Sequence, residues 1–242
     1  MRSASRSLAL WLSLFLFWGL VFWGVWQLLT NPDAGLPREW NPLEPLHISD
    51  PVTPVTGLKL RRTANNGPAC LSALETGSVT FQSLDDLSVS DQCGISNRVS
   101  LRQSGSARIA PVETSCAVAL RMALWEEHDL SPAALDLLGA ELTRIDHLSS
   151  FNCREIRIPG GGGGRMSTHA TAEAIDITGF QFKDGRRLRL IDDWDGGGAE
   201  AEFLRQARDG ACTWFATTLG PDYNALHADH FHLQSRGWGT CN

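Results

Sequence analysis

The segment LHADHFHLQ near the end of the chain contains three of its seven histidines, His227, His230 and His232. We expect this segment to form a strand, in which successive side chains point to opposite faces, so that His230 and His232 share a face. Phe231 and Leu233 then point to the other face and are suited to a hydrophobic core, which leaves the histidines facing a cleft. Two imidazoles side by side on a strand are suited to binding one metal ion such as Zn²⁺.

A second segment, STHATAEAID, offers further metal ligands. It contains His169 and Asp176, an imidazole nitrogen and a carboxylate oxygen, and Asp176 begins a predicted strand. A catalytic zinc typically takes three protein ligands and leaves one position for water, so the two segments together hold enough ligands for such a site. The other histidines have no such neighbours, and we interpret them as ordinary hydrogen-bonded residues: His47, His128 and His147.

Side chains near the second segment could contribute to the same chemistry. Arg154 and Arg165 flank a glycine run, and either could bind a substrate carboxylate or a developing oxyanion, although solvation is the commoner role of an exposed arginine. No base is visible for Ser167, so we expect it to cap a turn or to hydrogen-bond a ligand, not to act as a nucleophile. The run Gly160 to Gly164 lacks the Lys-Ser/Thr of a phosphate loop and is expected to be a flexible loop.

Helices and strands must hold these residues in place, and hydrophobic periodicity predicts an α+β domain with a small, mostly antiparallel sheet and flanking helices. Ser131 is expected to be the N-cap of one helix and Gly139 to end it. The predicted helices are 115–128, 131–139 and 200–219. The predicted strands are 141–148, a hairpin that turns at Asp184-Gly185, and the histidine segment.

The N-terminal part predicts a membrane anchor. The uncharged apolar run from Leu8 to Leu29 is long enough to cross a bilayer as a helix. Arg2 and Arg6 precede it and the first charge after it is Asp33, so the positive-inside rule places the N-terminus in the cytoplasm and the rest of the chain outside. A cleaved signal peptide is the alternative, but Trp26 and its neighbours occupy the place of a small-residue cleavage site.

Domain boundaries follow from this pattern. We expect a cytoplasmic stub and transmembrane anchor over residues 1–29, a stiff proline-rich linker over 30–57, and a folded domain over 58–242 with its core at 116–241. The linker could instead pack on the domain as an irregular arm, since it contains Trp40 and two leucines. The expected location is the inner (cytoplasmic) membrane, crossed once, with the C-terminal domain in the periplasm.

The cysteines agree with export. The chain has six, and no pair has the C-x-x-C spacing of a zinc ribbon or a redox motif. In an oxidising compartment an even number indicates disulfides; buried free thiols are the alternative. The sequence does not fix the pairing, and we expect neighbours along the chain to pair, as Cys70–Cys93, Cys116–Cys153 and Cys212–Cys241.

The charge of the chain argues against one class of partner. Its formal net charge is −6 at pH 7, and no cluster of Lys and Arg stands out. Nucleic acid requires such clusters to neutralise its phosphates, so nucleic acid is not an expected ligand.

Several segments together carry a resemblance to a known family. STHATAEAID and HADHFH are similar to SxHxxGxAxD and HxxHxH, the patterns of the zinc peptidases grouped with lysostaphin, D-Ala-D-Ala carboxypeptidase and sonic hedgehog, and HADHFH is closest to penicillin-insensitive murein endopeptidase. From about Cys116 to Cys241 the chain more closely resembles the bacterial extensin-like C-terminal domain family. The segments that carry this resemblance are FNCREIR, STHATAEAIDITGF, DGRRLRL, DGACTWF, LGPDYNALHADHFHL and the terminal cysteine.

This resemblance implies a hedgehog/D-Ala-D-Ala carboxypeptidase-like fold and a zinc site. The zinc ligands it implies are His169, Asp176 and His232. It places His230 and His227 at positions of catalytic histidines, where His230 would take or return a proton. On the predicted strand Asp229 faces away from the histidines, so we expect it to hold the strand, and a hydrogen bond to a ligand histidine is the alternative.

The chain departs from the resembling pattern between the ligands. The family glycine is Ala172 here, and Glu173 stands where an asparagine is usual. If that position needs a positive φ, alanine there would cost stability or displace Asp176. Glu173 adds a carboxylate that could act as a base, although a surface position is the commoner outcome.

These features together predict a membrane-anchored, periplasm-facing zinc metallohydrolase that cleaves peptide bonds in peptidoglycan, of the D,D-carboxypeptidase or endopeptidase type. Its partners would be peptidoglycan stem peptides or crosslinks. The alternative is a non-catalytic module that keeps the fold and the zinc but only binds wall peptides or a partner protein. In a third interpretation zinc is purely structural, with every coordination position filled by protein.

Overall fold

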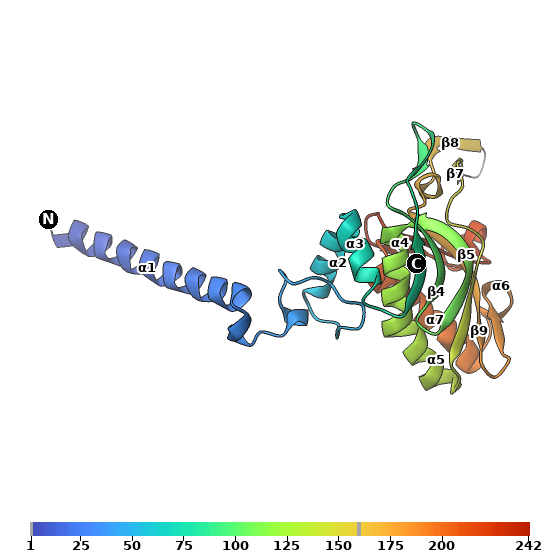
Figure 1. The fold of residues 1–242 in the computed structure, drawn as a ribbon, viewed down its shortest axis with the longest axis horizontal. Coiled ribbons are helices and arrows are strands. Elements are labelled where there is room, and N and C mark those ends of the chain that lie inside the picture. Colours follow the sequence, from blue (N-terminus) through green and yellow to red (C-terminus); the bar gives the residue numbers. More distant parts are fainter. Residues whose placement is uncertain (1, 159–160) are drawn as a thin grey trace. The chain divides into compact units, whose positions relative to one another are not determined.

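The computed structural model describes residues 2–158 and 161–242, which form two compact units (Figure 1). The first unit comprises the residues up to Leu46 together with Pro51–Leu60, and the second comprises His47–Asp50 and Arg61–Asn242. The first unit contains the apolar helix, and the second contains the sheet and the candidate site.

The first unit begins with helix α1 (Arg2–Thr30), which contains the segment predicted to cross a membrane. Residues Leu10–Thr30 have a mean hydropathy of 1.8, and among the described residues they form the one helix that is long and apolar enough to span a bilayer. A membrane anchor and a signal sequence both have this character. Short 3-10 helices follow, Pro32–Ala34 and Arg38–Trp40.

The second unit is built on a mostly antiparallel, nine-stranded sheet with the order β1-β4-β5-β6-β9-β12-β11-β13, in which β10 also pairs with β9. Within the described ranges, β5–β6 and β11–β13 are the parallel pairs. The strands are β1 (Val79–Ser83), β4 (Arg98–Ser104), β5 (Ala107–Ser115), β6 (Leu142–His147), β9 (Ala174–Phe182), β10 (Arg187–Arg189), β11 (Thr217–Leu219), β12 (Phe231–Gln234) and β13 (Thr240–Cys241). The predicted α+β class, the strand at 141–148 and the hairpin at Asp184-Gly185 are confirmed.

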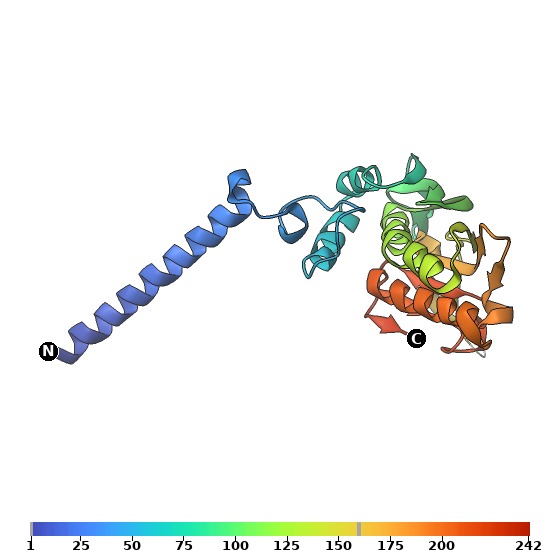
Figure 2. The ribbon, with the colours of Figure 1, turned by 90° about the horizontal axis from the view of Figure 1, so that it is seen from below.

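Helices and sheet enclose an aromatic core. Trp125 in α4 packs edge-on to Phe180 in β9, with ring centroids 6.0 Å apart, and Phe180 packs on Phe203 in α7 at 5.3 Å. The indole N–H of Trp125 donates to Ala207 O at 2.9 Å. Helices α4, α5 and α7 therefore pack together beside the sheet (Figure 2). The helices of the two units after α1 are α2 (Thr56–Ala64), α3 (Gly67–Leu74), α4 (Cys116–Trp125), α5 (Ser131–Leu138), α6 (Leu190–Asp193) and α7 (Gly198–Trp214).

The predicted helix over 131–139 ends as expected but does not begin as expected. Gly139 has φ 63 and ψ 22, the left-handed conformation that commonly ends a helix. Ser131 is not an N-cap, because the π-turn Glu126–Leu130 joins α4 to α5 without a break. The Ser131 hydroxyl instead donates to the buried Glu126 carboxylate at 2.6 Å.

The predicted helix over 200–219 is too long at its C-terminal end. Helix α7 stops at Trp214, and Thr217–Leu219 form strand β11, which pairs with β12 through Thr217↔Gln234 and Leu219↔His232. The helical periodicity of Leu219 is coincidental, because pairing with a strand that lies later in the chain determines its conformation, whereas Phe215 is the C-cap of α7.

Two of the three expected disulfides are wrong. The pairs are Cys70–Cys116, Cys93–Cys153 and Cys212–Cys241, so only the last expected pair, Cys212–Cys241, is confirmed, while Cys70–Cys93 and Cys116–Cys153 do not form. Helix α3 packs against α4, which brings Cys70 to Cys116. Proximity along the sequence misled the prediction, because helix packing decides which cysteines meet.

Two small ribbons stand apart from the main sheet. Strands β2 (Leu87–Ser90) and β3 (Cys93–Ile95) form one, and β7 (Glu155–Ile158) and β8 (Gly161–Met166) form the other. The glycine run was expected to be a loop, but Gly161 to Gly164 belong to β8; Gly160 lies outside the described residues. Glycine within a strand is typical of irregular pairing, and the β7–β8 register shifts between Glu155 and Arg157.

Candidate metal centre

The sheet brings Asp176 and His232 together. Strand β12 pairs antiparallel with β9, and His232 lies directly opposite Asp176. Directly opposed residues point to the same face of a sheet, and His232 Nδ1 lies 2.7 Å from Asp176 Oδ1. On the other face of β12, Phe231 and Leu233 are fully buried, as the alternation of side chains predicts.

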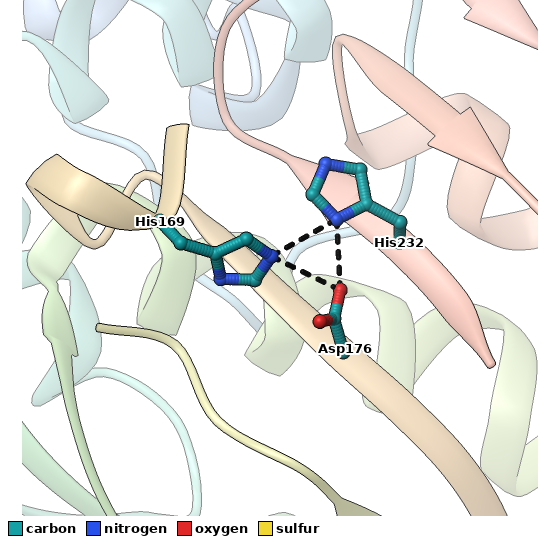
Figure 3. A group of neighbouring side chains, drawn as sticks. All are labelled: His169, Asp176 and His232. Carbon is teal, nitrogen blue, oxygen red and sulfur yellow. Dashed lines mark hydrogen bonds and ion pairs between the residues drawn. The ribbon is translucent and has the colours of Figure 1, made fainter. Parts of the chain in front are cut away.

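His169 reaches the same point from outside the sheet. It lies on the 3-10 turn η4 (Thr168–Thr171), which Ser167 caps by accepting the N–H of His169. Its Nε2 lies 3.1 Å from His232 Nδ1 and 3.2 Å from Asp176 Oδ1 (Figure 3). The donor atoms of the three residues all lie within 4.8 Å of one another, which is a spacing that a metal ion can bridge.

Hydrogen bonding fixes which nitrogen of His169 faces this centre. Its Nδ1 lies 2.9 Å from the backbone carbonyl of Ser150. A carbonyl only accepts, so Nδ1 carries a hydrogen, and Nε2 is the nitrogen that faces Asp176 and His232. Ligand histidines of metal sites are commonly oriented by such a bond from their other ring nitrogen. The backbone N–H of Asn152 also donates to His169 O at 2.9 Å.

The protonation states also suit a cation. Burial opposes ionisation of Asp176, but hydrogen bonds with His169 and His232 outweigh it and hold the pKa of this carboxyl well below its usual range. Burial lowers the pKa of His232, which keeps this imidazole neutral at neutral pH. A carboxylate and neutral imidazoles are the forms that bind metal.

His230 and His227 lie beside the centre but not in β12, which begins at Phe231. His230 Nε2 lies 3.6 Å from Asp176 Oδ1, and its Nδ1 is 2.7 Å from Asp229 Oδ1. Asp229 therefore contacts His230. The expectation that it would hold the strand or hydrogen-bond a ligand histidine is wrong.

His227 sits on the 3-10 turn η5 (Ala225–His227). Its ring lies 5.3 Å from that of His230 and 5.7 Å from that of His232, measured between centroids. Asn224 Oδ1 lies 2.8 Å from His227 Nδ1. Burial, followed by the charges of His230 and His232, lowers the pKa of His227 to about 4.

All seven sequence-predicted site residues line one cleft of about 1310 Å³. Arg154 and Arg165 enter it from the base of the β7–β8 ribbon, where Ser167 N donates to Arg154 O at 3.0 Å. Residues that sequence reasoning had not singled out also line the cleft, among them Asn152, Tyr223, Asn224, Leu226, Arg236 and Trp238. Asn152, Tyr223, Asn224 and Leu226 lie in segments that carry the family resemblance, FNCREIR and LGPDYNALHADHFHL, and Asn224 also stands at an N-cap position that could have been recognised.

The two departures from the expected pattern have distinct outcomes. Ala172 has φ 49 and ψ 33, so this position does require the left-handed conformation that glycine adopts at least cost. Glu173 is held in an ion pair with Arg236, with 2.7 Å between Oε2 and Nε. Its carboxylate is therefore engaged by an arginine and is not a free base at the centre.

Comparisons with known proteins identify one relationship. A family model described as "Extensin-like protein C-terminus" matches residues 68–242, which include every residue of the cleft and all six cysteines. No curated protein matches the chain, and no solved structure matches it.

Proposed function

The chain belongs to the extensin-like protein C-terminus family, and we propose that it is a zinc-dependent hydrolase that cleaves peptide bonds in peptidoglycan. The reaction would be of the D,D-carboxypeptidase or endopeptidase type. The observation that supports this most is the convergence of His169, Asp176 and His232 within 4.8 Å in a cleft that two further histidines and three arginines line.

The metal ligands follow from the donor atoms. His169 Nε2, Asp176 Oδ1 and His232 Nδ1 would hold the ion. When bound, Zn²⁺ lowers the pKa of a coordinated water and polarises a carbonyl. Two nitrogens and one oxygen leave a position for water, as in catalytic and unlike structural zinc sites.

The other residues of the cleft have roles that follow from their contacts. His230 would accept and return a proton at Nε2, since Asp229 engages its Nδ1 and Nε2 is the nitrogen that lies 3.6 Å from Asp176 Oδ1. His227, which is neutral at neutral pH, would orient His230 across their ring contact. Arg154 and Arg165 would bind a substrate carboxylate or a developing oxyanion.

The proposed location is the periplasmic side of the inner membrane. Three disulfides support an oxidising compartment. Helix α1, with Arg2 and Arg6 before its apolar run, supports an anchor whose N-terminus faces the cytoplasm. Peptidoglycan is the peptide polymer in that compartment, which is the reason for proposing it as the substrate.

His230→Ala in the full chain, purified in detergent, tests the activity. We expect the variant to keep its zinc, measured by elemental analysis, and to lose at least about 100-fold in the rate of muropeptide cleavage followed by mass spectrometry, because a general base contributes about 10²–10⁴-fold. His147→Ala, which changes a histidine that does not line the cleft and lies 2.8 Å from Ala110 O, is the control and should keep both. Wild-type protein that binds zinc and cleaves no muropeptide would contradict the proposal.

That last result would favour the second candidate, a binding module that retains the metal. The strain at Ala172, next to the turn that carries His169, is the observation in its favour. Such a module would bind wall peptides equally well before and after His230→Ala.

A further inference from the structure

The sheet holds two of the three proposed ligands, but not the third. The β9–β12 ladder places His232 opposite Asp176, so backbone hydrogen bonds set the spacing between these two donors. His169 lies on turn η4 outside the sheet. Its distance from the other two donors therefore depends on what holds the turn.

Glu173 connects this turn to the end of β12 through its backbone. Its N–H donates to Thr168 O at 3.0 Å, across the turn, and its carbonyl accepts from Ser235 N at 2.9 Å. The Ser235 hydroxyl donates to the same carbonyl at 3.2 Å. One residue thus joins the segment that carries His169 to the residue that follows β12.

The Glu173 side chain makes the same connection a second time. Its Oε2 accepts from Arg236 Nε at 2.7 Å and from Thr171 Oγ1 at 3.0 Å. The side chains of Glu173 and Arg236 are 30% and 57% exposed, and ion pairs this exposed add little to overall stability. We therefore expect this pair to affect the local geometry of the turn and not the overall stability of the protein.

The residue before Glu173 makes local restraint necessary. Ala172 has φ 49, a conformation that a residue other than glycine keeps only where its surroundings fix it. Ser115 N donates to Ala172 O at 3.2 Å on one side. On the other side the restraint comes from Glu173.

We propose that Glu173 and Arg236 are a positioning pair that holds the His169 turn at the correct distance from Asp176 and His232, and so sets the zinc affinity of the centre. The inference rests on the metal centre of the proposed function. Neither residue is catalytic: Glu173 acts through the turn, and Arg236 acts through Glu173.

A double-mutant cycle in the full chain tests the pair. Glu173→Ala and Arg236→Ala are each expected to lower zinc affinity about 10-fold, the lower end of what supporting contacts of metal ligands contribute. Because the two residues act together, the double variant should lose about 10-fold and not 100-fold. Zinc affinity is measured by competition with a chromophoric chelator, and the visible spectrum of the cobalt-substituted protein reports ligand geometry.

The matched control is the ion pair Arg98–Glu113, at 2.6 Å between β4 and β5 and outside the cleft. Arg98→Ala and Glu113→Ala should leave zinc affinity and the cobalt spectrum unchanged. In the metal-free protein, these control variants should lower the thermal unfolding temperature at least as much as the test variants do. Unchanged zinc affinity in Glu173→Ala, or losses that add in the double variant, would overturn the pair. Wild-type protein without zinc affinity would overturn the metal centre as well, whereas zinc binding without peptide cleavage would overturn only the proposed activity.

Discussion

One carboxylate oxygen organises the candidate site. Asp176 Oδ1 lies 2.7 Å from His232 Nδ1, 3.2 Å from His169 Nε2 and 3.6 Å from His230 Nε2. Two imidazole nitrogens, His169 Nε2 and His232 Nδ1, therefore converge on one carboxylate oxygen, and all three are atoms that can coordinate a metal ion. A cation satisfies all of them at once, which is the physical reason for interpreting the cluster as a metal site and not as a hydrogen-bonded network.

His227 makes the stability of the metal-free protein depend on pH. Its pKa is lowered to about 4 in the folded protein, while a histidine in an unfolded chain titrates near about 6.5. Between these two values the unfolded chain binds the additional proton, so the free energy of unfolding rises with pH and falls on acidification. His227→Gln should flatten this dependence, measured by urea unfolding with a chelator present. Equal slopes for the wild type and the variant would show that His227 is not the origin.

The sequence predicted the positions of some residues of the candidate site better than those of others. The spacing of His169, Asp176 and His232 and the family resemblance were sufficient to bring the three together. The carbonyl of Ser150 could not be predicted, because a backbone acceptor has no residue type and its position depends on the fold. Asp229 was misplaced because the strand begins only at Phe231.

At the scale of elements, turn η4 stores strain that can be removed. A non-glycine residue in the left-handed conformation costs roughly 1–2 kcal/mol, and Ala172 has φ 49. Ala172→Gly should therefore stabilise the protein by about 1 kcal/mol, partly offset by the greater freedom of glycine in the unfolded chain. Thermal unfolding measures the gain. Ala170→Gly, in the same turn without a positive φ, should destabilise, and a loss of stability in Ala172→Gly would contradict the assignment of strain.

Local signals predicted elements whose ends depend on local chemistry. Gly139 ends α5 in the left-handed conformation, and Asp184-Gly185 turns the hairpin. Local signals failed where a partner distant in the sequence determines the conformation. Thr217 lies in a segment with helical periodicity, but it forms a strand that pairs with Gln234. The sequence did not predict the π-turn Glu126–Leu130, in which the buried Glu126 carboxylate accepts a hydrogen bond from the Ser131 hydroxyl.

At the scale of the whole molecule, one disulfide is connected to the site. Cys93–Cys153 links strand β3 to the segment that contains Asn152, whose N–H donates to His169 O. The sequence predicted that the six cysteines would pair but could not show this connection, because it depends on how the β2–β3 ribbon packs near η4.

Removal of this disulfide should affect both stability and metal binding. It closes a loop with a sequence separation of 60 residues, and its loss should cost about 4 kcal/mol in the chain-entropy account. Cys93→Ser/Cys153→Ser should also weaken zinc binding, because the Asn152 segment loses its restraint. Cys212→Ser/Cys241→Ser, which removes the bond between α7 and β13, two elements that carry none of the three ligands, should cost stability alone. Equal zinc affinities for both double variants would refute the connection, and chemical unfolding with chelator competition provides both measurements.

The distribution of the donors along the chain has a consequence for the order of assembly. His169 and His232 are 63 residues apart, and His232 becomes a partner of Asp176 only after β12 has joined β9. While the polypeptide is still emerging from the ribosome or the export channel, it therefore has at most two of the three proposed ligands in place. Metal can bind at this centre only after β12 has joined the sheet. Metal binding would therefore follow folding of the domain and would not initiate folding.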